Sequence, residues 1–306
     1  MSAEHEVDNF HHVRDAAGFD IPRGMADAHG HGALDIQLPE IFGFQLTKFM
    51  VLQVIAAVLV YLIFRGLARR IQNGDPAKGR FWNFWEAIAL YIRDEVVRPT
   101  IGDHHHDHGD EYDFHGAGTH GHGVAGQNSH PADQYLPFIW SCFFYILICN
   151  LLGAVPWLGA ATGNINVTGV LAVCAFVATV MYGFKAMGPA GFFGNMFPDT
   201  GIVGIVGRGL SCFIFVIEVF GFFVKHAVLA VRLFANIMGG HTVVAVILGF
   251  IAVAAHGNGL LWGAVTFGSV FGQVLIGLLE LFVAFLQAYV FVFLATIFLA
   301  GAVHEH

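Results

Sequence analysis

Charged residues are scarce in this chain of 306 residues. Only 12% of its residues are Asp, Glu, Lys or Arg, whereas 56% are hydrophobic. A soluble domain usually carries about 25% charged residues. A chain with so little charge cannot cover a water-facing surface. The composition therefore excludes a soluble globular protein and predicts an integral membrane protein whose main solvent is lipid.

Basic residues are scarce at the amino-terminal end. The first 44 residues contain eight acidic residues and only two basic ones, Arg14 and Arg23. Signal and transit peptides need basic, acid-poor starts, so this composition argues against both. We expect residues 1–44 to be an acidic, histidine-containing external segment, and the first apolar span to act as its own insertion signal. The lack of a presequence favours a bacterial inner membrane over an imported mitochondrial protein.

Cysteine pairs and nucleotide-binding motifs are also missing. No CxxC pair exists, which argues against a zinc site. The four cysteines each lie in an apolar run and are expected to be packing residues: Cys142, Cys149, Cys174 and Cys212. Neither a P-loop nor a GxGxxG sequence that opens a helix is present, and no basic patch suggests nucleic acid. We expect no nucleotide chemistry, no cofactor and no nucleic-acid partner on this chain.

What the chain has instead is a series of long apolar runs. The first extends from about residue 45 to 64, long enough to cross a membrane, and ends in Arg65, Arg69 and Arg70. We assign the first transmembrane helix to 45–72. Basic residues concentrate on the cytoplasmic side of membrane proteins, so the amino terminus is predicted to lie outside.

The next part of the chain is more polar. Over 79–100, apolar residues recur at helical spacing while charged residues take the other faces, which predicts an amphipathic helix in the membrane interface. A transmembrane hairpin is predicted over 134–187, and Lys185 near its end points to the cytoplasmic side. Residues 188–208 are rich in Gly and Pro, and we expect them to form a cytoplasmic interfacial stretch.

Two very long apolar segments, 209–254 and 259–303, complete the chain. As a single helix, each would reach more than about 60 Å, roughly twice the hydrocarbon thickness. Either each contains a reverse turn or each is one strongly tilted helix. The scarcity of turn residues favours tilt in the first, while the glycine-rich residues 259–277 leave a separate turn open. The predicted fold is all-α, with about five transmembrane helices, the last two long and tilted, and an interfacial amphipathic helix.

A histidine-rich insert interrupts this apolar pattern over 103–133. Imidazole suits Zn²⁺, Ni²⁺ or Cu²⁺, but the spacing matches no closed structural zinc site. The weak metal-ligand candidates are His104, His105, His106 and His108. Because the insert is rich in Gly and charge, we expect a flexible cytoplasmic linker that binds metal only weakly.

Few polar groups interrupt the two long apolar segments. A charge in hydrocarbon costs about 2.5–3.5 kcal/mol, so each one is a functional candidate by default. The candidates are Glu218, Lys225, Arg232, His241 and Glu280, with two amides, Asn236 and Gln287. Steps of seven residues place Glu218, Lys225 and Arg232 on one helical face, and Asn236 stays near that face.

The chemistry of these groups suggests a proton path. Arg is effectively never deprotonated in a protein, so Arg232 is a fixed positive charge that could attract a partner's carboxylate and block a direct ion leak. His241 points to another side of a straight helix, while Glu280 and Gln287 share a face of the next one. His241 and Glu280 can titrate near neutrality in a tuned environment, which suits a relay. The pattern indicates two half-paths separated by a permanent cation.

Structural explanations of the same residues stay open at this point. Arg232 and Glu218 could form an ion pair without a further role. Lys225 could extend its ammonium group to the membrane interface, and His241 could be a hydrogen-bonded packing residue. Glu280 is harder to explain in this way because no Lys or Arg lies in its own segment.

Two sequence motifs carry a resemblance to a known family. Leu229-Ala-Val-Arg-Leu-Phe-Ala-Asn-Ile-Met-Gly-Gly-His241 resembles the signature of the ATP synthase a subunit, in which an essential Arg is followed four residues later by Asn. Glu280-Leu-Phe-Val-Ala-Phe-Leu-Gln-Ala-Tyr-Val-Phe291 resembles the last helix of that family. Asn166-Val-Thr168 and Phe44-Gln-Leu-Thr-Lys-Phe-Met50 fit more weakly. The resemblance covers about residues 40–303.

The resemblance implies a role for each matching residue. Arg232 matches the essential stator Arg, and His241 and Glu280 match the relay pair of the family. The other matches are Asn236 and Gln287, which correspond to polar residues lining the same path, Glu218, which corresponds to an acid in the opposite half-channel, and Lys225 as a possible secondary residue. The chain departs from the pattern at His226, where many members have Pro, so the local bend there is open.

The implied function is that of the stator a subunit of a rotary F-type ATP synthase. Such a subunit conducts protons through two half-channels to and from a ring of c subunits, while ATP chemistry takes place on other chains. The implied partners are the c ring, the peripheral-stalk b subunits, the remaining synthase subunits and lipid. The alternative is a metal-ion or proton-coupled secondary transporter with a His-rich cytosolic loop, for which His241 and Glu280 are too few ligands. A scaffold would leave Arg232 without a purpose.

Overall fold

The structure is a computed structural model. It describes residues 18–22, 33–41, 44–71, 78–102, 130–155, 159–195, 205–254 and 259–303. Most of the expected external segment and of the histidine-rich insert, including His104, His105, His106 and His108, lies outside these residues, as does 196–204 of the expected interfacial stretch. In the described ranges, no group of three or more His, Cys, Asp or Glu side chains is placed to hold a metal ion.

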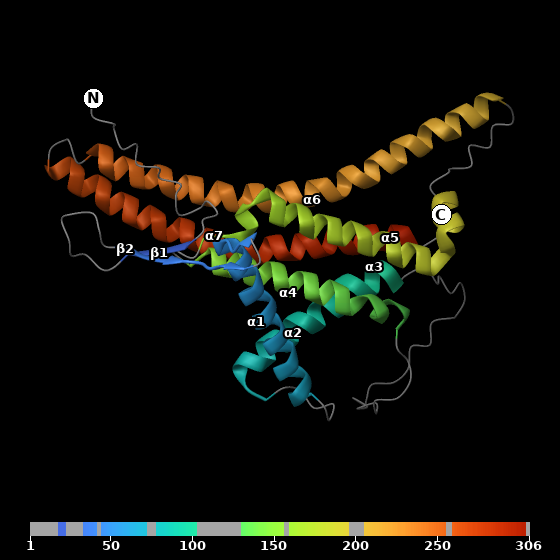
Figure 1. Cartoon of the computed structure of the whole chain (residues 1–306), viewed down its shortest axis with the longest axis horizontal. Helices are drawn as coiled ribbons and strands as arrows, with labels where there is room; N and C mark the ends of the chain where they lie inside the picture. Colours follow the sequence, from blue (N-terminus) through green and yellow to red (C-terminus); the bar gives the residue numbers. More distant parts are fainter. Residues whose placement is uncertain are drawn as a thin grey trace, which may run out of the picture.

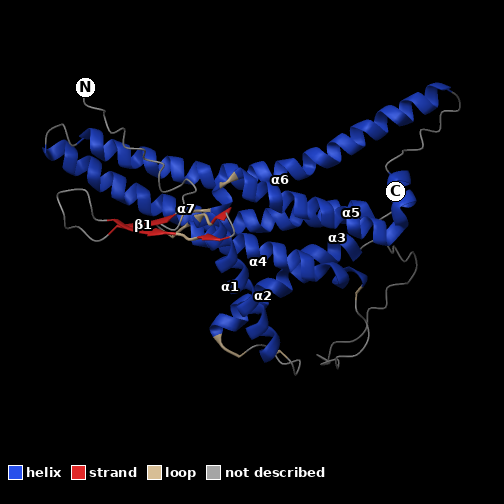
Figure 2. Ribbon diagram, in the orientation of Figure 1, coloured by secondary structure: helices blue, strands red, loops and turns tan. Residues whose placement is uncertain are grey.

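Five helices are long and apolar enough to cross a membrane, which confirms the predicted fold class. They are α1 (Lys48–Arg70), α4 (Leu136–Gly153), α5 (Ile165–Asn195), α6 (Ile205–Ala254) and α7 (Gly259–Val303). A 3-10 turn, η2 (Pro131–Tyr135), leads into α4. Helices suit these segments because lipid offers no hydrogen-bond partner, so a spanning backbone must satisfy its own polar groups (Figure 2).

The two longest helices answer the question that hydropathy leaves open. α6 has 50 residues and α7 has 45, and neither contains a reverse turn, so the glycine-rich residues 259–277 are helical. The two helices run antiparallel and side by side (Figure 1). At 1.5 Å per residue they are about 75 and 68 Å long, more than twice the hydrocarbon thickness, so they can lie in a bilayer only when strongly tilted.

α1 differs from these helices in length and direction. Its 23 residues give a rise of about 34 Å, which matches one direct crossing. In Figure 1 it runs across the bundle of long helices rather than along it. A membrane normal taken along α1 therefore leaves α6 and α7 steeply inclined, as the sequence predicts.

The polar segment after α1 is also helical. α2 (Arg80–Tyr91), a π-helical turn η1 (Ile92–Val97) and α3 (Arg98–Gly102) follow one another without a break in helical backbone angles. They are not among the spanning helices. Their apolar stripe, which includes Trp85, Ile92 and Val96, is buried, and Trp140 Nε1 of α4 donates a hydrogen bond to Ala89 O at 3.0 Å. The stripe therefore packs on protein.

The two ends of the histidine-rich insert lie next to each other. Arg98 donates from Nε and Nη2 to the two carboxylate oxygens of Asp133, at 3.1 and 2.9 Å. Gly102 contacts the ring of His130 so closely that any side chain there would overlap it. Hydrogen bonding from Arg93, aided by the charge of Arg98, lowers the pKa of the Asp94 carboxyl below its usual range. This ion network holds the flanks of the insert together.

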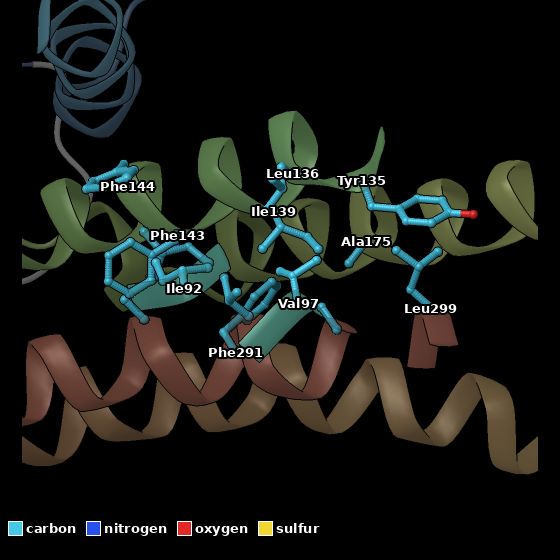
Figure 3. Close-up of a cluster of buried hydrophobic side chains, with 14 of the residues drawn as sticks. Ile92, Val97, Tyr135, Leu136, Ile139, Phe143, Phe144, Ala175, Phe291 and Leu299 are labelled. Carbon is cyan, nitrogen blue, oxygen red and sulfur yellow. The ribbon is translucent and has the colours of Figure 1, made fainter. Parts of the chain in front are cut away.

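The core lies where α4 packs on α7, with η1 and α3 beside them. Its largest fully buried side chains include Phe144 and Ile139 of α4, Phe291 and Leu299 of α7, and Ile92 of η1. In Figure 3, Ile139, Phe143 and Phe291 lie between the α4 ribbon and the ribbons beneath it, whereas Phe144 lies on the opposite side of α4, against Phe64 of α1. Because lipid tails are as apolar as Leu, such a core is stabilised by close van der Waals packing and not by exclusion from water.

Two local features complete the fold. Within α5, Gly188 has φ +75°, and Pro189 follows, so the chain breaks at the predicted boundary between the hairpin and the interfacial stretch, and a short helical stub up to Asn195 folds back. The amino-terminal segment forms two short antiparallel hairpins that the sequence did not predict, β1 (Gly18–Pro22) with β2 (Ala33–Gln37) and β3 (Glu40–Ile41) with β4 (Phe44–Gln45).

Candidate functional site

The outward face of α6 carries three charges. Glu218, Lys225 and Arg232 are all exposed, and Lys225 Nζ lies 4.0 Å from Glu218 Oε1. Glu218 and Arg232 are separated by fourteen residues of continuous helix, a rise of about 21 Å, so their side chains cannot meet. The structural ion pair between these two residues is therefore excluded, and Glu218 faces Lys225 instead.

Arg232 has no ion pair or hydrogen bond within the described part of the chain. Its neighbours Val228 and Val231 are also well exposed, so this face of α6 is not covered by any described helix. An unpaired guanidinium in an apolar setting is costly. The arrangement is typical of a surface whose carboxylate partner lies on another molecule.

Glu280 of α7 lies against the backbone of α6. A Cβ atom added to Gly240 would stand 3.1 Å from Glu280 Oε1 and 3.3 Å from its carboxyl carbon. Gly240 therefore provides the space in which the carboxylate sits. The same addition at Gly239 would meet nothing within 4 Å, so the two neighbouring glycines have different roles.

A cavity of about 260 Å³ lies between α6 and α7 at this point. Asn236 and Glu280 are its polar lining side chains, and apolar residues such as Ile237 and Ile276 form the remaining wall. Helical spacing placed Asn236 near the face of Arg232, and the family resemblance assigned it to the same path as Glu280. In the structure, the half-buried Asn236 lines one cavity with Glu280.

Two further residues of the predicted path, His241 and Gln287, do not line this cavity. His241 follows Gly240, and its Nε2 atom is buried without a hydrogen-bond partner among the described residues. No ion pair or hydrogen bond joins it to Glu280 in the same part of the chain. Gln287, two turns beyond Glu280, is buried at 6% exposure. The structure thus brings Asn236 and Glu280 to one cavity and leaves His241 and Gln287 out of its lining.

The sequence did not predict a buried polar contact of Asn150 next to the cavity. Thr162 Oγ1 donates to Asn150 Oδ1 at 2.9 Å, and Asn150 Nδ2 donates to Ala284 O at 3.4 Å. Ala284 lies one turn after Glu280 on α7. The turn η3 (Ala161–Gly163) also packs on α6 at Ile237. The signal that could have found Asn150 is its place as an uncompensated amide inside an apolar span.

His226, the departure from the family pattern, is buried at 3% exposure. Its Nδ1 lies 2.9 Å from Phe222 O, and since a carbonyl oxygen only accepts, Nδ1 carries the proton. Phe176, Phe222 and Phe298 surround the ring. α6 continues through His226 without a break in the helix, and Figure 1 shows that the helix as a whole is bowed.

Comparisons with known proteins agree with this architecture. The family described as ATP synthase A chain matches residues 120–300. ATP synthase subunit a of Chloroherpeton thalassium is 33% identical over 98% of this chain and 78% of its own length. The chain belongs to the ATP synthase A chain family. The subunit a of Myxococcus xanthus is also 33% identical, over 94% of this chain and 80% of its own.

The family match covers every candidate residue of the proton path. The matched region contains α4, α5, α6 and nearly all of α7, and so includes Glu218, Arg232, His241 and Glu280. A second form, subunit a 2 of Chlorobaculum tepidum, is 33% identical over 95% of this chain and 71% of its own length. The helices outside the family match, α1 to α3, are therefore also shared with relatives.

Proposed function

We propose that this chain is the stator a subunit of a rotary F-type ATP synthase, and that it conducts protons through two half-channels to and from a ring of c subunits. The observation that carries the proposal is the position of Arg232. It is exposed on the uncovered face of α6, without an ion pair or hydrogen bond to any residue that the structure describes, and the Glu280 cavity lies farther along the same helix. A fixed cation in this position serves to meet a carboxylate on a neighbouring ring.

The acidic groups stand on either side of Arg232. Glu218 lies about 21 Å before it along α6, and Gly240, which contacts Glu280, lies about 12 Å beyond it. Protons enter from outside past Glu280, His241, Asn236 and Gln287, load a ring carboxylate, and leave past Glu218 after rotation. Lys225, at 4.0 Å from Glu218, is a secondary residue of the exit side.

Arg232 performs two tasks in this scheme. Its charge favours the ionised form of a ring carboxylate that approaches it, so the carboxylate releases its proton on the exit side. Because a guanidinium does not give up its own proton, it also bars protons from passing directly between the half-channels. ATP chemistry takes place on other subunits, and this chain carries no catalytic site.

The remaining expectations follow from the same proposal. The partners are the c ring, the peripheral-stalk b subunits and the other synthase subunits. The chain lies in a bacterial inner membrane with its amino terminus outside and its carboxyl terminus in the cytoplasm, and α2 to α3 lie at the interface. A metal-ion or proton-coupled secondary transporter is set aside because of the family to which the chain belongs.

Substitution of Arg232 tests the proposal. Arg232→Ala should abolish coupled ATP synthesis in an assembled complex, and Arg232→Lys should rescue it poorly because an ammonium group has fewer donors and a pKa that falls on burial. The matched control is Arg93→Ala, which removes a half-buried arginine paired with Asp94 outside the spans. Reconstituted vesicles with a pH-sensitive dye measure the coupling. Normal synthesis in assembled Arg232→Ala complexes would refute the stator role.

A further inference from the structure

The end of α1 and the start of α2 carry a group of basic side chains that the proton path does not use. Arg65, Arg69 and Arg70 end α1, Lys78 precedes α2 and Arg80 begins it. These five, which we name the α1–α2 basic cluster, are more than a third of the 14 Lys and Arg residues of the chain. All five are exposed.

The cluster lacks neutralising carboxylates. Within the described ranges, no Asp or Glu lies within ion-pair distance of any of its members. Arg98, by contrast, binds both Asp94 and Asp133. The first turn of α2 contributes no acidic residue, and Asp75 is the one acid between 65 and 80 in the sequence. The cluster therefore presents a net positive charge on an otherwise acidic chain.

Aromatic side chains contact two of the guanidinium groups, those of Arg65 and Arg70. Arg70 lies over the ring of Trp82, 4.8 Å from its centroid. That ring fills the space beside Gly66, where any side chain would overlap it, so α1 and α2 are fixed against each other. Arg65 lies 5.8 Å from the centroid of Tyr61 and donates to its hydroxyl at 2.9 Å. Stacked guanidiniums lose less freedom when they bind an anion.

Exposed apolar groups adjoin these cations. Tyr61, Phe81 and Phe84 are 58%, 59% and 49% exposed, and the lipid-facing side of α1 continues from Tyr61 towards Val54. The charged end of a span lies at headgroup depth, where basic clusters attract anionic lipids. Cations at that depth beside exposed aromatic and aliphatic groups match a molecule with a phosphate head and apolar tails. A free phosphate would have no use for the apolar flank.

We propose that the α1–α2 basic cluster binds the headgroup of an anionic phospholipid. The phosphate lies against Arg69, Arg70 and Lys78, and the acyl chains run along the exposed apolar sides of α1 and α2. The site is independent of the proton path, because none of its residues lines the α6–α7 cavity.

Lipid titration of the purified full-length chain tests this site. Phosphatidylglycerol is added to the delipidated protein in detergent, with phosphatidylcholine as the neutral lipid and inorganic phosphate as a competitor, and bound lipid is counted by native mass spectrometry. Phosphatidylglycerol should bind saturably and at least about tenfold more tightly than phosphatidylcholine. Equal binding of the two lipids would overturn the proposal. Competition by millimolar phosphate would show a free-anion site in its place.

Two double glutamine variants test whether lipid binding depends on this site or only on the net charge of the protein. Arg69→Gln with Arg70→Gln should weaken phosphatidylglycerol binding about tenfold or more, whereas Arg93→Gln with Lys185→Gln removes the same charge elsewhere and should change it less than about twofold. Arg69→Lys with Arg70→Lys keeps the charge and should retain binding, which controls for misfolding. Equal losses in the two glutamine variants would contradict a local site.

Discussion

The two halves of α7 lie in different surroundings. Ten of its eleven buried residues lie at or after Ala284, and only Ser269 lies before. In the first half, side chains such as Leu260 and Phe267 are 90% and 78% exposed. Figure 1 shows why: α6 and α7 continue as a pair beyond the ends of α4 and α5. Glu280 stands one turn before the packed half begins.

The contrast indicates where a titratable group can work in this protein. The packed half fixes side chains to within a rotamer because neighbours surround them on all sides. The paired half leaves room between its helices, with an apolar hollow of about 580 Å³ near Ser269 and the smaller cavity at Glu280. The carboxyl group of Glu280 stands at the border of these two halves, with packed side chains on one side and the cavity on the other.

The largest effect is expected from the border residue itself. Glu280→Gln keeps the shape of the side chain but removes its titratable proton, so proton flux should fall about 10²-fold or more. ATP-driven acidification of reconstituted vesicles measures it. Gln273, two turns earlier in the paired half, is the matched control, and Gln273→Ala should leave flux within about twofold. An unimpaired Glu280→Gln complex would show that the border carboxyl does not carry protons.

The adjacent glycines give a finer comparison. Gly240→Ala would place a Cβ 3.1 Å from Glu280 Oε1 and displace the carboxylate, whereas Gly239→Ala would meet nothing within 4 Å. Both changes raise helix propensity equally, by about 1 kcal/mol. A difference in proton flux between the two variants therefore reports the contact with Glu280. We expect about a tenfold loss of flux for Gly240→Ala only. Equal flux in the two variants would mean that the contact is not functional.

A smaller effect is expected from the polar contact that anchors the packed half. Asn150→Leu removes the hydrogen bonds to Thr162 and Ala284, which should lower the free energy of unfolding by about 1 kcal/mol. Equilibrium unfolding of the full chain in mixed micelles measures this. Thr242→Ala removes only a bond to Met238 O on its own helix and should cost less. A larger loss of unfolding free energy for Thr242→Ala would show that the Asn150 contact does not anchor the packed half.

The smallest effect is expected far from both halves. Because Gly102 and His130 lie in contact and Arg98 binds Asp133, the flanks of the insert can be joined directly. Deletion of 103–129 should therefore leave ATP-driven proton pumping within about twofold, since the flanking ion network remains. Pumping assays of the full-length and deletion complexes, in the presence and absence of a chelator, measure this rate. Loss of pumping in an assembled deletion complex would assign the insert a mechanical or metal-dependent role.

Much of the fold could be predicted because it depends on local composition. Runs of apolar residues longer than a bilayer crossing predict helices wherever they occur, and seven-residue steps assign Glu218, Lys225 and Arg232 to one face without any tertiary information. The choice between a tilted helix and a reverse turn over 259–277 could not be made in this way. Hydropathy measures preference for lipid, and both arrangements bury the same residues in it.

The sequence by itself determined the number of spanning helices, their apolar character and the residues with the chemistry of a proton path. Only the tertiary structure decided which of them meet. It placed Glu280 in the space left by Gly240, joined Asn150 to Ala284 across 134 positions, and buried His226 among phenylalanines. Helical periodicity orients a side chain about its own axis. The pairing of faces depends on how helices cross, which close packing between distant segments decides.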